Sequence, residues 1–311
     1  MSVDVLAFGE TMATLRAEEP GPLRLARSMR LSVAGAESTV AIGLSRLGHT
    51  SAWVGRVGAD EFGRLVVDRL RAERVDVSAV TVDDAAPTGL LVREQRTADL
   101  ARVRYYRTGS AGSRLCPDDL APALARGARV LLLSGITPAL SDTALAATRA
   151  AVAHAAGTGW VVCLDVNYRA ALWSRSAAAD TLAPLAASAT VVVGDAAELA
   201  LVGGTEPVRG LLAGGVREVV VKEGERGATV WTADGSRSAP ARPVTAVDVI
   251  GAGDAFVAGY LSGLLDGLDI EARLDRAVTV AGFAVGSAGD WEGLPTRDEL
   301  SPAGPPGTTV R

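Results

Sequence analysis

Cysteine and histidine are scarce in this sequence, with two residues of each among 311. Cys116 and Cys163 lie far apart and form no C-x-x-C pair, so we expect two buried free thiols in a reducing compartment rather than a disulfide framework. His49 and His154 are isolated in the sequence, which argues against a structural zinc site.

Long apolar runs and basic blocks are also missing. No stretch approaches the roughly 18 consecutive apolar residues of a membrane span, so we expect none. The N-terminal run Val3–Gly9 has no basic residue before it and is typical of a first strand rather than of a signal peptide. The net charge is −5 and lysine and arginine form no cluster, which argues against nucleic acid as the main partner. Together these absences predict a cytoplasmic globular protein.

Lysine, asparagine and glutamine each occur once, as Lys222, Asn167 and Gln95. We interpret this skew as a result of genome composition, with arginine in place of lysine, and it indicates no function by itself. It does draw attention to the surroundings of Lys222 and Asn167.

The apolar content of 48% fits a globular α/β protein with one large core or two modest ones. Six short, largely apolar runs are typical of strands covered on both faces: Val3–Gly9, Ala52–Gly58, Val130–Ser134, Trp160–Asp165, Thr190–Gly194 and Glu218–Lys222. Helical patterns separate them: one stops at Gly48, one follows Asp60 as N-cap, and one runs from Ser141 to near Gly157. This alternation predicts a three-layer α/β/α core around a mainly parallel sheet.

Two segments, residues 11–33 and 86–109, interrupt this alternation of strands and helices. They contain strand-like pieces of alternating polarity: Met12–Ala17, Arg30–Val33, Gly89–Arg93 and Arg102–Arg107. A sheet with helices on both faces has little room for them. We therefore predict a small β-sheet lid that projects over a site at the strand ends, with two surface hairpins as the alternative. The core would comprise residues 1–10, 34–85 and 110–300, and residues 301–311, rich in Pro and Gly, would form a flexible tail.

The most informative stretch is D-V-I-G-A-G-D, from Asp248 to Asp254, which precedes an apolar run and is typical of a glycine-rich turn that opens a helix. N–H groups at a helix start have no partner within the helix, the dipole there is positive, and glycines let a ligand approach the backbone. The turn of Gly251, Ala252 and Gly253 therefore suits a phosphate whose charge grows during transfer, with Asp254 beside it as a base. The alternative is an ordinary helix start with an acidic residue that complements the dipole.

Over nearly its full length the sequence resembles the ribokinase-like (PfkB) family of sugar kinases. The stretch A-G-A-E-S-T-V-A-I-G-L-S-R-L-G, from Ala34 to Gly48, is similar to the family's glycine pair leading into a helix, with Ala34 in place of the first glycine. Asp248–Asp254 is similar to the family's D-T-x-G-A-G-D, and K-E-G-E-R-G, from Lys222 to Gly227, to its K-x-G-x-x-G turn on the nucleotide side. The combination of these matches, in this order and spacing, is highly specific.

Within that family, three further stretches resemble 2-keto-3-deoxygluconate kinases: Y-Y-R-T-G-S-A-G-S at 105–113, L-S-G-I-T-P-A-L at 133–140 and D-V-N-Y-R-A-A-L-W at 165–173. The chemistry fits independently, because a 2-keto-3-deoxy acid carries a carboxylate and arginine presents a planar fork that matches one. Arg107 and Arg169 could clamp this group, which a neutral sugar such as ribose lacks.

The resemblance implies a role for each matched residue. It places at the sugar Gly35, Thr39, Tyr105, Arg107 and Arg169, and at the transferred phosphoryl group Gly251, Ala252, Gly253 and Asp254. The residues that it places at the nucleotide, taken as ATP, are Lys222, Gly224, Gly227, Asp195 and Asp248. It places Glu198 at hydrated Mg²⁺. The ordinary alternatives are a helix cap for Thr39, solvated charges for Lys222 and Glu198, and a stacked Tyr–Arg pair on the lid.

Three positions depart from the family pattern. Thr39 stands where the family usually has an asparagine that contacts sugar hydroxyls, and threonine still donates and accepts hydrogen bonds but is shorter. Asp195 replaces the asparagine of the family's N-x-x-E motif, and an aspartate suits hydrated magnesium, which favours oxygen ligands. Val249 replaces the threonine of the second signature. These departures leave the catalytic residues in place and bear on the choice of sugar.

We therefore predict ATP-dependent phosphorylation of the terminal hydroxyl of 2-keto-3-deoxygluconate or a close sugar acid. Two alternatives stay open. One is a fructokinase, ribokinase or nucleoside kinase, and the other is a catalytically silent sugar-acid sensor, against which the intact G-A-G-D argues. The exposed strands of the lid could pair across a two-fold axis, so we expect a homodimer.

Overall fold

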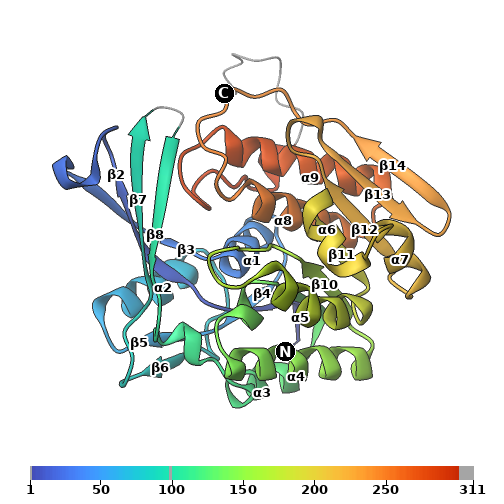
Figure 1. The fold of residues 1–311 in the computed structure, drawn as a ribbon, viewed down its shortest axis with the longest axis horizontal. Coiled ribbons are helices and arrows are strands. Elements are labelled where there is room, and N and C mark those ends of the chain that lie inside the picture. Colours follow the sequence, from blue (N-terminus) through green and yellow to red (C-terminus); the bar gives the residue numbers. More distant parts are fainter. Residues whose placement is uncertain (1, 98–99, 301–311) are drawn as a thin grey trace.

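The computed structural model describes residues 2–97 and 100–300, and its centre is an eight-stranded sheet with helices on both faces (Figure 1). In spatial order the strands are β14 (Gly235–Ala239), β13 (Ala228–Thr232), β12 (Glu218–Lys222), β11 (Val191–Gly194), β10 (Val161–Asp165), β9 (Ala128–Ser134), β1 (Val3–Phe8) and β4 (Ser51–Val54). The pairs from β12 to β4 are parallel, and β13 and β14 join as antiparallel strands. The predicted mainly parallel α/β/α core is confirmed.

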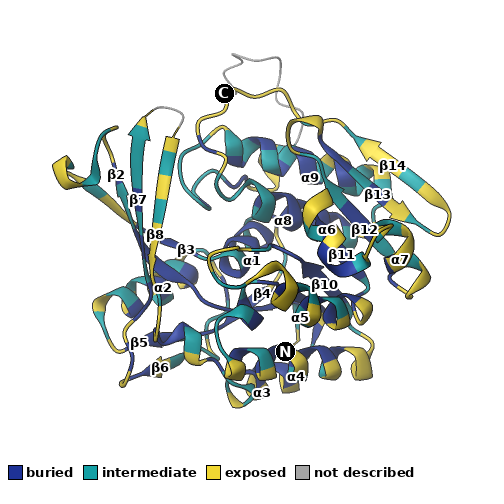
Figure 2. Ribbon diagram, in the orientation of Figure 1, coloured by how far each residue is buried: buried dark blue, intermediate teal, exposed yellow. Residues whose placement is uncertain are grey.

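Alternate residues of the central strands face opposite helical layers. In β1, Val5 and Ala7 belong to one buried cluster and Leu6 and Phe8 to the other. The first layer is formed by α1 (Ala36–Arg46), α2 (Glu61–Ala72), α8 (Ala252–Leu265) and α9 (Ile270–Val285). The second is formed by α3 (Pro117–Arg126), α4 (Asp142–Thr158), α5 (Arg175–Ala187), α6 (Ala196–Gly203) and α7 (Pro207–Ala213). Both faces of the sheet are therefore dry, as the buried ribbon at its centre shows (Figure 2), and this explains the continuous apolar runs.

The chain also forms short 3₁₀ helices at Leu23–Leu25, Gly112–Arg114, Thr137–Ala139, Gly224–Arg226 and Asp298–Leu300. Asp60 and Ser141 accept N–H bonds at the starts of α2 and α4, so the predicted N-caps are confirmed. Both cysteines are free, but only Cys163 is buried, because Cys116 caps the start of α3 and is half-exposed. No helix of the described residues is long and apolar enough to cross a membrane.

One predicted strand is wrong. The run Ala52–Gly58 divides at Gly55 into β4 and β5 (Arg56–Gly58), and β5 pairs with β6 (Thr81–Asp83) in a separate two-stranded sheet. A Cβ on Gly55 would lie 2.3 Å from the Trp53 ring and 2.6 Å from the Gly9 carbonyl oxygen. The chain therefore turns away from the large sheet at a position where only glycine fits.

The segments at residues 11–33 and 86–109 form a second, four-stranded sheet, which we call the small sheet. Its order is β3 (Met29–Ala34), β2 (Met12–Ala17), β7 (Leu90–Thr97) and β8 (Leu100–Tyr106), with β2 and β7 parallel and the other pairs antiparallel. It stands beside the core as a separate wing (Figure 1). These strands confirm the predicted second sheet, whereas the division into core and lid stays a prediction. Residues 98–99 and the predicted tail 301–311 lie outside the described residues.

The strand order reverses at β1, which lies between β4 and β9. Ligands of open α/β sheets bind at the carboxyl ends of the strands beside such a switch point. Polar side chains end or follow the strands at this edge: Glu10 after β1, Ser134 at the end of β9, Asp165 at the end of β10 and Lys222 at the end of β12. The fold thus gathers charged groups where a ligand is expected.

Candidate active site

A cavity of about 580 Å³ lies between the small sheet and the carboxyl ends of the core strands. The predicted site residues that line it are Gly35, Tyr105, Arg107, Arg169, Gly251 and Asp254. The fold therefore brings together positions from four separate stretches of the sequence. Thr39 does not line the cavity, since it lies buried within α1 with 1% of its surface exposed.

Asp254 lies in the first turn of α8, facing the cavity. Burial, followed by the nearby carboxylate of Asp165, raises the pKa of Asp254 to about 7, while Lys222 and Arg169 act to lower it. A carboxylate with a pKa near neutrality is suited to accept a proton from a hydroxyl group at physiological pH. The position and the shifted pKa both support the predicted role as a base.

The start of α8 requires glycine for two different reasons. Gly251 caps the helix in the left-handed conformation with φ 77°, and a Cβ there would lie 2.1 Å from the carbonyl oxygen of Asp290. Gly253 is already helical, and the nearest atom to a Cβ there would be Nζ of Lys222 at 3.7 Å. The first glycine forms the turn, whereas the second leaves open space above the N–H groups of the first helical turn, where an anion can approach. Of these groups, the Ala252 N–H donates a long bond of 3.4 Å to the Val249 carbonyl oxygen.

Lys222 reaches this space from the end of β12. Its ammonium group donates to Asp165 Oδ1 at 2.8 Å and lies 3.9 Å from Glu198 Oε2. Although burial acts in the opposite direction, these two carboxylates raise the pKa of Lys222, so it stays charged. A half-buried cation beside the first turn of α8 is well placed for a phosphate.

Asp195 and Glu198 form a capping box at the start of α6. Glu198 N–H donates to Asp195 Oδ1 at 2.8 Å, and Asp195 N–H donates to Glu198 Oε2 at 2.9 Å. Glu198 Oε1 also accepts from the Tyr168 N–H at 3.0 Å. Burial raises the pKa of Glu198. Both carboxylates are therefore held in place by the backbone, and their roles toward nucleotide and metal stay predictions.

The carboxylates near Lys222 fit a hydrated magnesium ion. Among the described residues, no group of three or more His, Cys, Asp or Glu side chains is arranged to hold a metal. Magnesium usually keeps several waters and binds proteins through one or two carboxylates together with substrate phosphates. Glu198 and Asp165, which lie 3.9 and 2.8 Å from Nζ of Lys222, are oxygen donors of that kind.

The two arginines predicted to bind a carboxylate differ in their surroundings. Arg107 donates from Nε to Glu10 Oε2 at 2.7 Å, and its Nη2 lies 2.5 Å from the same oxygen. Its guanidinium also lies 5.6 Å from the centre of the Tyr105 ring. Arg169 is exposed in the cavity, and no carboxylate of the described residues pairs with it. Only Arg169 therefore presents an uncompensated charge to a ligand.

Four charged residues of the cavity were not predicted from the sequence: Glu10, Glu37, Arg93 and Asp290. Burial raises the pKa of Glu37 to about 7, against the hydrogen bond from Thr137, which lies 2.6 Å away. Burial and the charge of Asp254 raise the pKa of Asp290 to about 7. Glu10 could have been found, because it follows β1 at the switch point, whereas Asp290 lies in a loop with no local signal.

Asp248 and the two glycines of the K-E-G-E-R-G turn complete the predicted set. Asp248 is buried beneath the turn and binds Arg93 of the small sheet. Gly224 and Gly227 have φ values of 60° and 106° in the turn between β12 and β13, and a Cβ on Gly227 would lie 2.0 Å from the Ala239 carbonyl oxygen. These glycines shape the turn, and the nucleotide roles of all three residues stay predictions.

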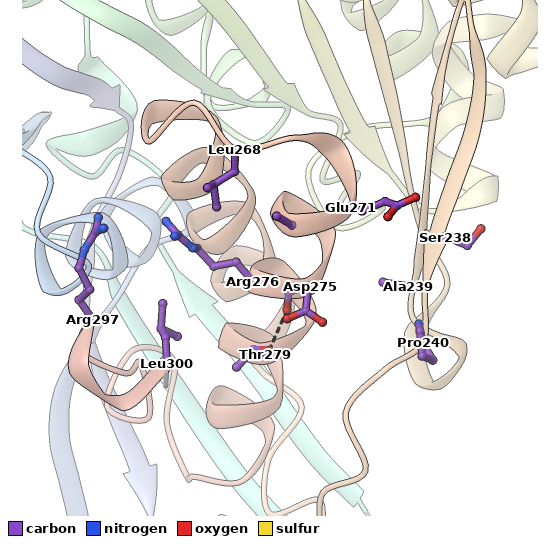
Figure 3. Close-up of a pocket in the computed structure, with 11 residues that line it drawn as sticks. Ser238, Ala239, Pro240, Leu268, Glu271, Asp275, Arg276, Thr279, Arg297 and Leu300 are labelled. Atoms are coloured by element: carbon purple, nitrogen blue, oxygen red, sulfur yellow. Dashed lines mark hydrogen bonds between the residues drawn. The ribbon is translucent and has the colours of Figure 1, made fainter. Parts of the chain in front are cut away.

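A larger hollow of about 720 Å³ lies elsewhere, between α9 and the end of β14 (Figure 3). Glu271, Asp275 and Thr279 of α9 face Ser238–Pro240 across it, and Arg276 and Arg297 line its other side. Both of these arginines bind Asp266, and none of the predicted site residues line the hollow. The smaller cavity at the strand ends therefore remains the candidate active site.

The chain is similar to known proteins over nearly its full length. The model of a family described as pfkB family carbohydrate kinase matches residues 3–297. A 2-dehydro-3-deoxygluconokinase from Thermoproteus tenax is 40% identical over 306 residues, which cover 96% of this chain and 93% of that protein.

Two solved structures are similar over nearly the whole chain. The crystal structure of a PfkB protein from Polaromonas sp. JS666 is 36% identical, with a TM-score of 0.88 and coverage of 97% of this chain and 100% of that one. A putative ribokinase II from E. coli in complex with ATP and Mg²⁺ has a TM-score of 0.90, covering 96% of this chain and 98% of that one. Its identity is 24%, so this second likeness shows the fold alone.

Proposed function

This chain belongs to the pfkB family of carbohydrate kinases, and we propose that it transfers the γ-phosphoryl group of ATP to the terminal hydroxyl of 2-keto-3-deoxygluconate or a close sugar acid. The observation that carries the proposal is the position of Asp254. Its carboxylate, with a pKa of about 7, lies in the first turn of α8 and lines the same cavity as Arg169.

Asp254 would accept the proton of the attacking hydroxyl as the oxygen bonds to the γ-phosphorus. The N–H groups at Gly251–Gly253 would then stabilise the negative charge on the transferring group, because they have no partners within the helix. The ammonium of Lys222 would add a positive charge on the same side, since it lies 3.7 Å from the space above Gly253. Positioning and electrostatic stabilisation of this kind supply most of the catalysis in phosphoryl transfer.

Mg²⁺, when bound, neutralises phosphate charge and orients the donor. We propose that Glu198 and Asp165 hold its hydration shell. Their carboxylates lie 3.9 and 2.8 Å from Nζ of Lys222, and the N–H groups of Tyr168 and Asp195 fix the orientation of Glu198.

The sugar would occupy the cavity with its carboxylate at Arg169, assisted by the free edge of Arg107. The small sheet would act as a lid that excludes water, which otherwise competes as phosphoryl acceptor. The relative from Thermoproteus tenax is named for 2-dehydro-3-deoxygluconate, which is the same compound as 2-keto-3-deoxygluconate. That name and the two arginines together favour a sugar acid.

A neutral-sugar kinase is the second candidate, and one observation favours it. Glu10 neutralises Arg107, so the cavity contains less positive charge than two free arginines would provide. The deciding experiment is a coupled assay of ADP production with 2-keto-3-deoxygluconate, its C4 epimer, fructose and ribose at equal concentrations. We expect the highest kcat/KM for one of the two acids. A preference for fructose or ribose would reject the sugar-acid proposal, and no ADP with any compound would reject the kinase.

A homodimer is proposed on the surface of the small sheet. β8 is an edge strand, and Leu31, Leu100 and Tyr106 of this sheet are 48%, 46% and 61% exposed. Edge strands with exposed apolar side chains pair readily across a two-fold axis. Light scattering would give the mass in solution, and a monomer would reject this proposal. A cytoplasmic location also stays a prediction.

A further inference from the structure

The small sheet contacts the phosphoryl-transfer turn through one buried ion pair. Arg93, on β7, donates from Nη2 to Asp248 Oδ1 at 2.9 Å, and its Nη1 donates to Oδ2. The side chains are 9% and 3% exposed, so the pair is shielded from solvent. Although burial acts to raise it, the hydrogen bond from Arg93 and the backbone bonds keep the pKa of Asp248 below its usual value.

Asp248 also accepts two backbone hydrogen bonds from the loops that form the transfer site. Its Oδ1 accepts from the Ile250 N–H at 3.1 Å, and its Oδ2 accepts from the Gly289 N–H at 3.2 Å. Ile250 immediately precedes Gly251, whose backbone lies against the carbonyl of Asp290. One carboxylate therefore joins the turn before α8, the loop after α9 and the small sheet.

Both oxygens of Asp248 are shared between Arg93 and one backbone N–H each. The arginine therefore determines where the carboxylate lies, and the carboxylate determines where the N–H groups of the turn point. The Nε–H of Arg93 is buried and makes no hydrogen bond with the described residues, so both terminal nitrogens, and not Nε, form the link.

We infer that Arg93 is a positioning residue for phosphoryl transfer. Through Asp248 it orients the turn at Gly251, so that the turn has its productive geometry only while the small sheet lies against the core. The inference rests on the proposed kinase activity and adds a residue that acts on the transfer step rather than on sugar affinity.

The test compares Arg93→Met and Arg93→Lys with the wild-type chain in steady-state kinetics, using the best acceptor of the substrate panel. A displacement of about 1 Å at a reacting centre can cost on the order of a hundredfold in rate. We expect Arg93→Met to lower kcat about ten- to a hundredfold and to change KM for sugar and ATP less than about threefold. Arg93→Lys keeps the charge but cannot bind both oxygens, so its kcat should lie between those of the wild type and Arg93→Met.

Arg104→Met is the matched control, because Arg104 is an exposed arginine of the neighbouring strand β8 that does not line the cavity. Its kcat should stay at the wild-type value. The double variant Arg93→Met with Asp248→Asn separates position from charge, since it removes the unpaired buried carboxylate. We expect it to recover thermal stability lost by Arg93→Met, but not kcat.

Three results would overturn the inference: an unchanged kcat in Arg93→Met, a rise in KM that accounts for the whole loss, or full recovery of kcat in the double variant. The last would mean that Arg93 only neutralises Asp248. If Arg93→Met does not fold, Arg93→Lys and the double variant decide by the same criteria. A wild-type chain that produces no ADP would reject the kinase proposal itself, and this inference with it.

Discussion

The guanidinium of Arg107 is already bound by the carboxylate of Glu10, whose side chain is 1% exposed. The hydroxyl of Ser110 donates to the same carboxylate. Arg107 is thereby fixed in direction and compensated in charge before any ligand arrives. A substrate carboxylate would meet the free edge of a neutralised arginine on one side and the unpaired Arg169 on the other, so the two arginines should contribute differently.

The first prediction concerns Arg169. Arg169→Met should raise KM for the sugar acid about ten- to a hundredfold, because a charge-assisted hydrogen bond is worth roughly 1.5–3 kcal/mol. The melting temperature should stay unchanged, because no carboxylate of the described residues loses a partner. Steady-state kinetics with the acid and with fructose measure the effect. Equal losses on both substrates would contradict a carboxylate contact.

The second prediction concerns Arg107 and is about stability. Removing one partner of a buried pair typically costs about 3–5 kcal/mol, because the other charge stays buried without compensation. Arg107→Met should therefore lower the melting temperature, unlike Arg169→Met. Combining it with Glu10→Gln should restore much of the loss. A double variant as unstable as Arg107→Met would show that the pair does not stabilise the fold.

Most of the architecture was predictable because it depends on local patterns. Alternating apolar strands and capped helices predict the layers, and α2 begins after Asp60 as its N-cap pattern indicates. The run through Gly55 was interpreted as one strand, because composition does not reveal that a side chain there would strike Trp53.

The candidate site was predictable where it depends on a contiguous motif. Gly251, Gly253 and Asp254 share one turn, so the sequence itself holds them together. Contacts across the fold were not predictable: Arg93 and Asp248 are separated by 155 residues, and their pairing depends on how the small sheet lies against the core. Asp290 was missed for the same reason.

The third prediction separates the two glycines of the turn. Gly251→Ala should destabilise the fold, because the new Cβ would meet a backbone carbonyl at 2.1 Å in a left-handed conformation. Gly253→Ala should leave the melting temperature near that of the wild type, since the nearest atom is 3.7 Å away. It should still lower kcat, because the methyl group occupies the approach to the N–H groups. Full activity in folded Gly253→Ala would place the phosphate elsewhere.

The fourth prediction couples activity to stability at Asp254. Asp254→Asn should lower kcat on the order of 10²–10⁴-fold, the usual worth of a positioned base. Because the folded pKa of about 7 exceeds the ordinary 3.8, the folded chain holds this proton more tightly than the unfolded one. Wild-type stability should therefore fall as pH rises from about 4 to 7 through this group.

Asparagine does not ionise, so Asp254→Asn does not lose stability through this position as the pH rises. Thermal unfolding of Asp254→Asn should occur at a higher temperature than that of the wild type at pH 8, with the difference shrinking toward pH 4. A variant less stable than the wild type at pH 8 would contradict the raised pKa, and near wild-type kcat would exclude Asp254 as the base.

The last prediction uses the neighbours of Asp254 to move its pKa. A base must be ionised, so kcat/KM should be high above the pKa of Asp254 and fall as pH drops through about 7. After burial, Asp165 is the largest cause that raises this pKa. Asp165→Asn removes that negative charge, so the acid limb of the pH profile, where kcat/KM falls, should move to lower pH. Lys222→Met removes a positive charge that lowers the same pKa, so its limb should move to higher pH.

The direction of the shift is what tests the assignment, because either variant could also lower the plateau rate. Asp195→Asn is the matched control: asparagine caps a helix about as well as aspartate, and Asp195 is exposed and is not among the main causes of the Asp254 shift. Its limb should keep the wild-type position. Glu37 and Asp290 also have pKa values of about 7 and face the same cavity. The contrary result is an acid limb that keeps its position in Asp165→Asn and Lys222→Met but moves in Glu37→Gln or Asp290→Asn. That result would assign the titration to Glu37 or Asp290 instead of Asp254.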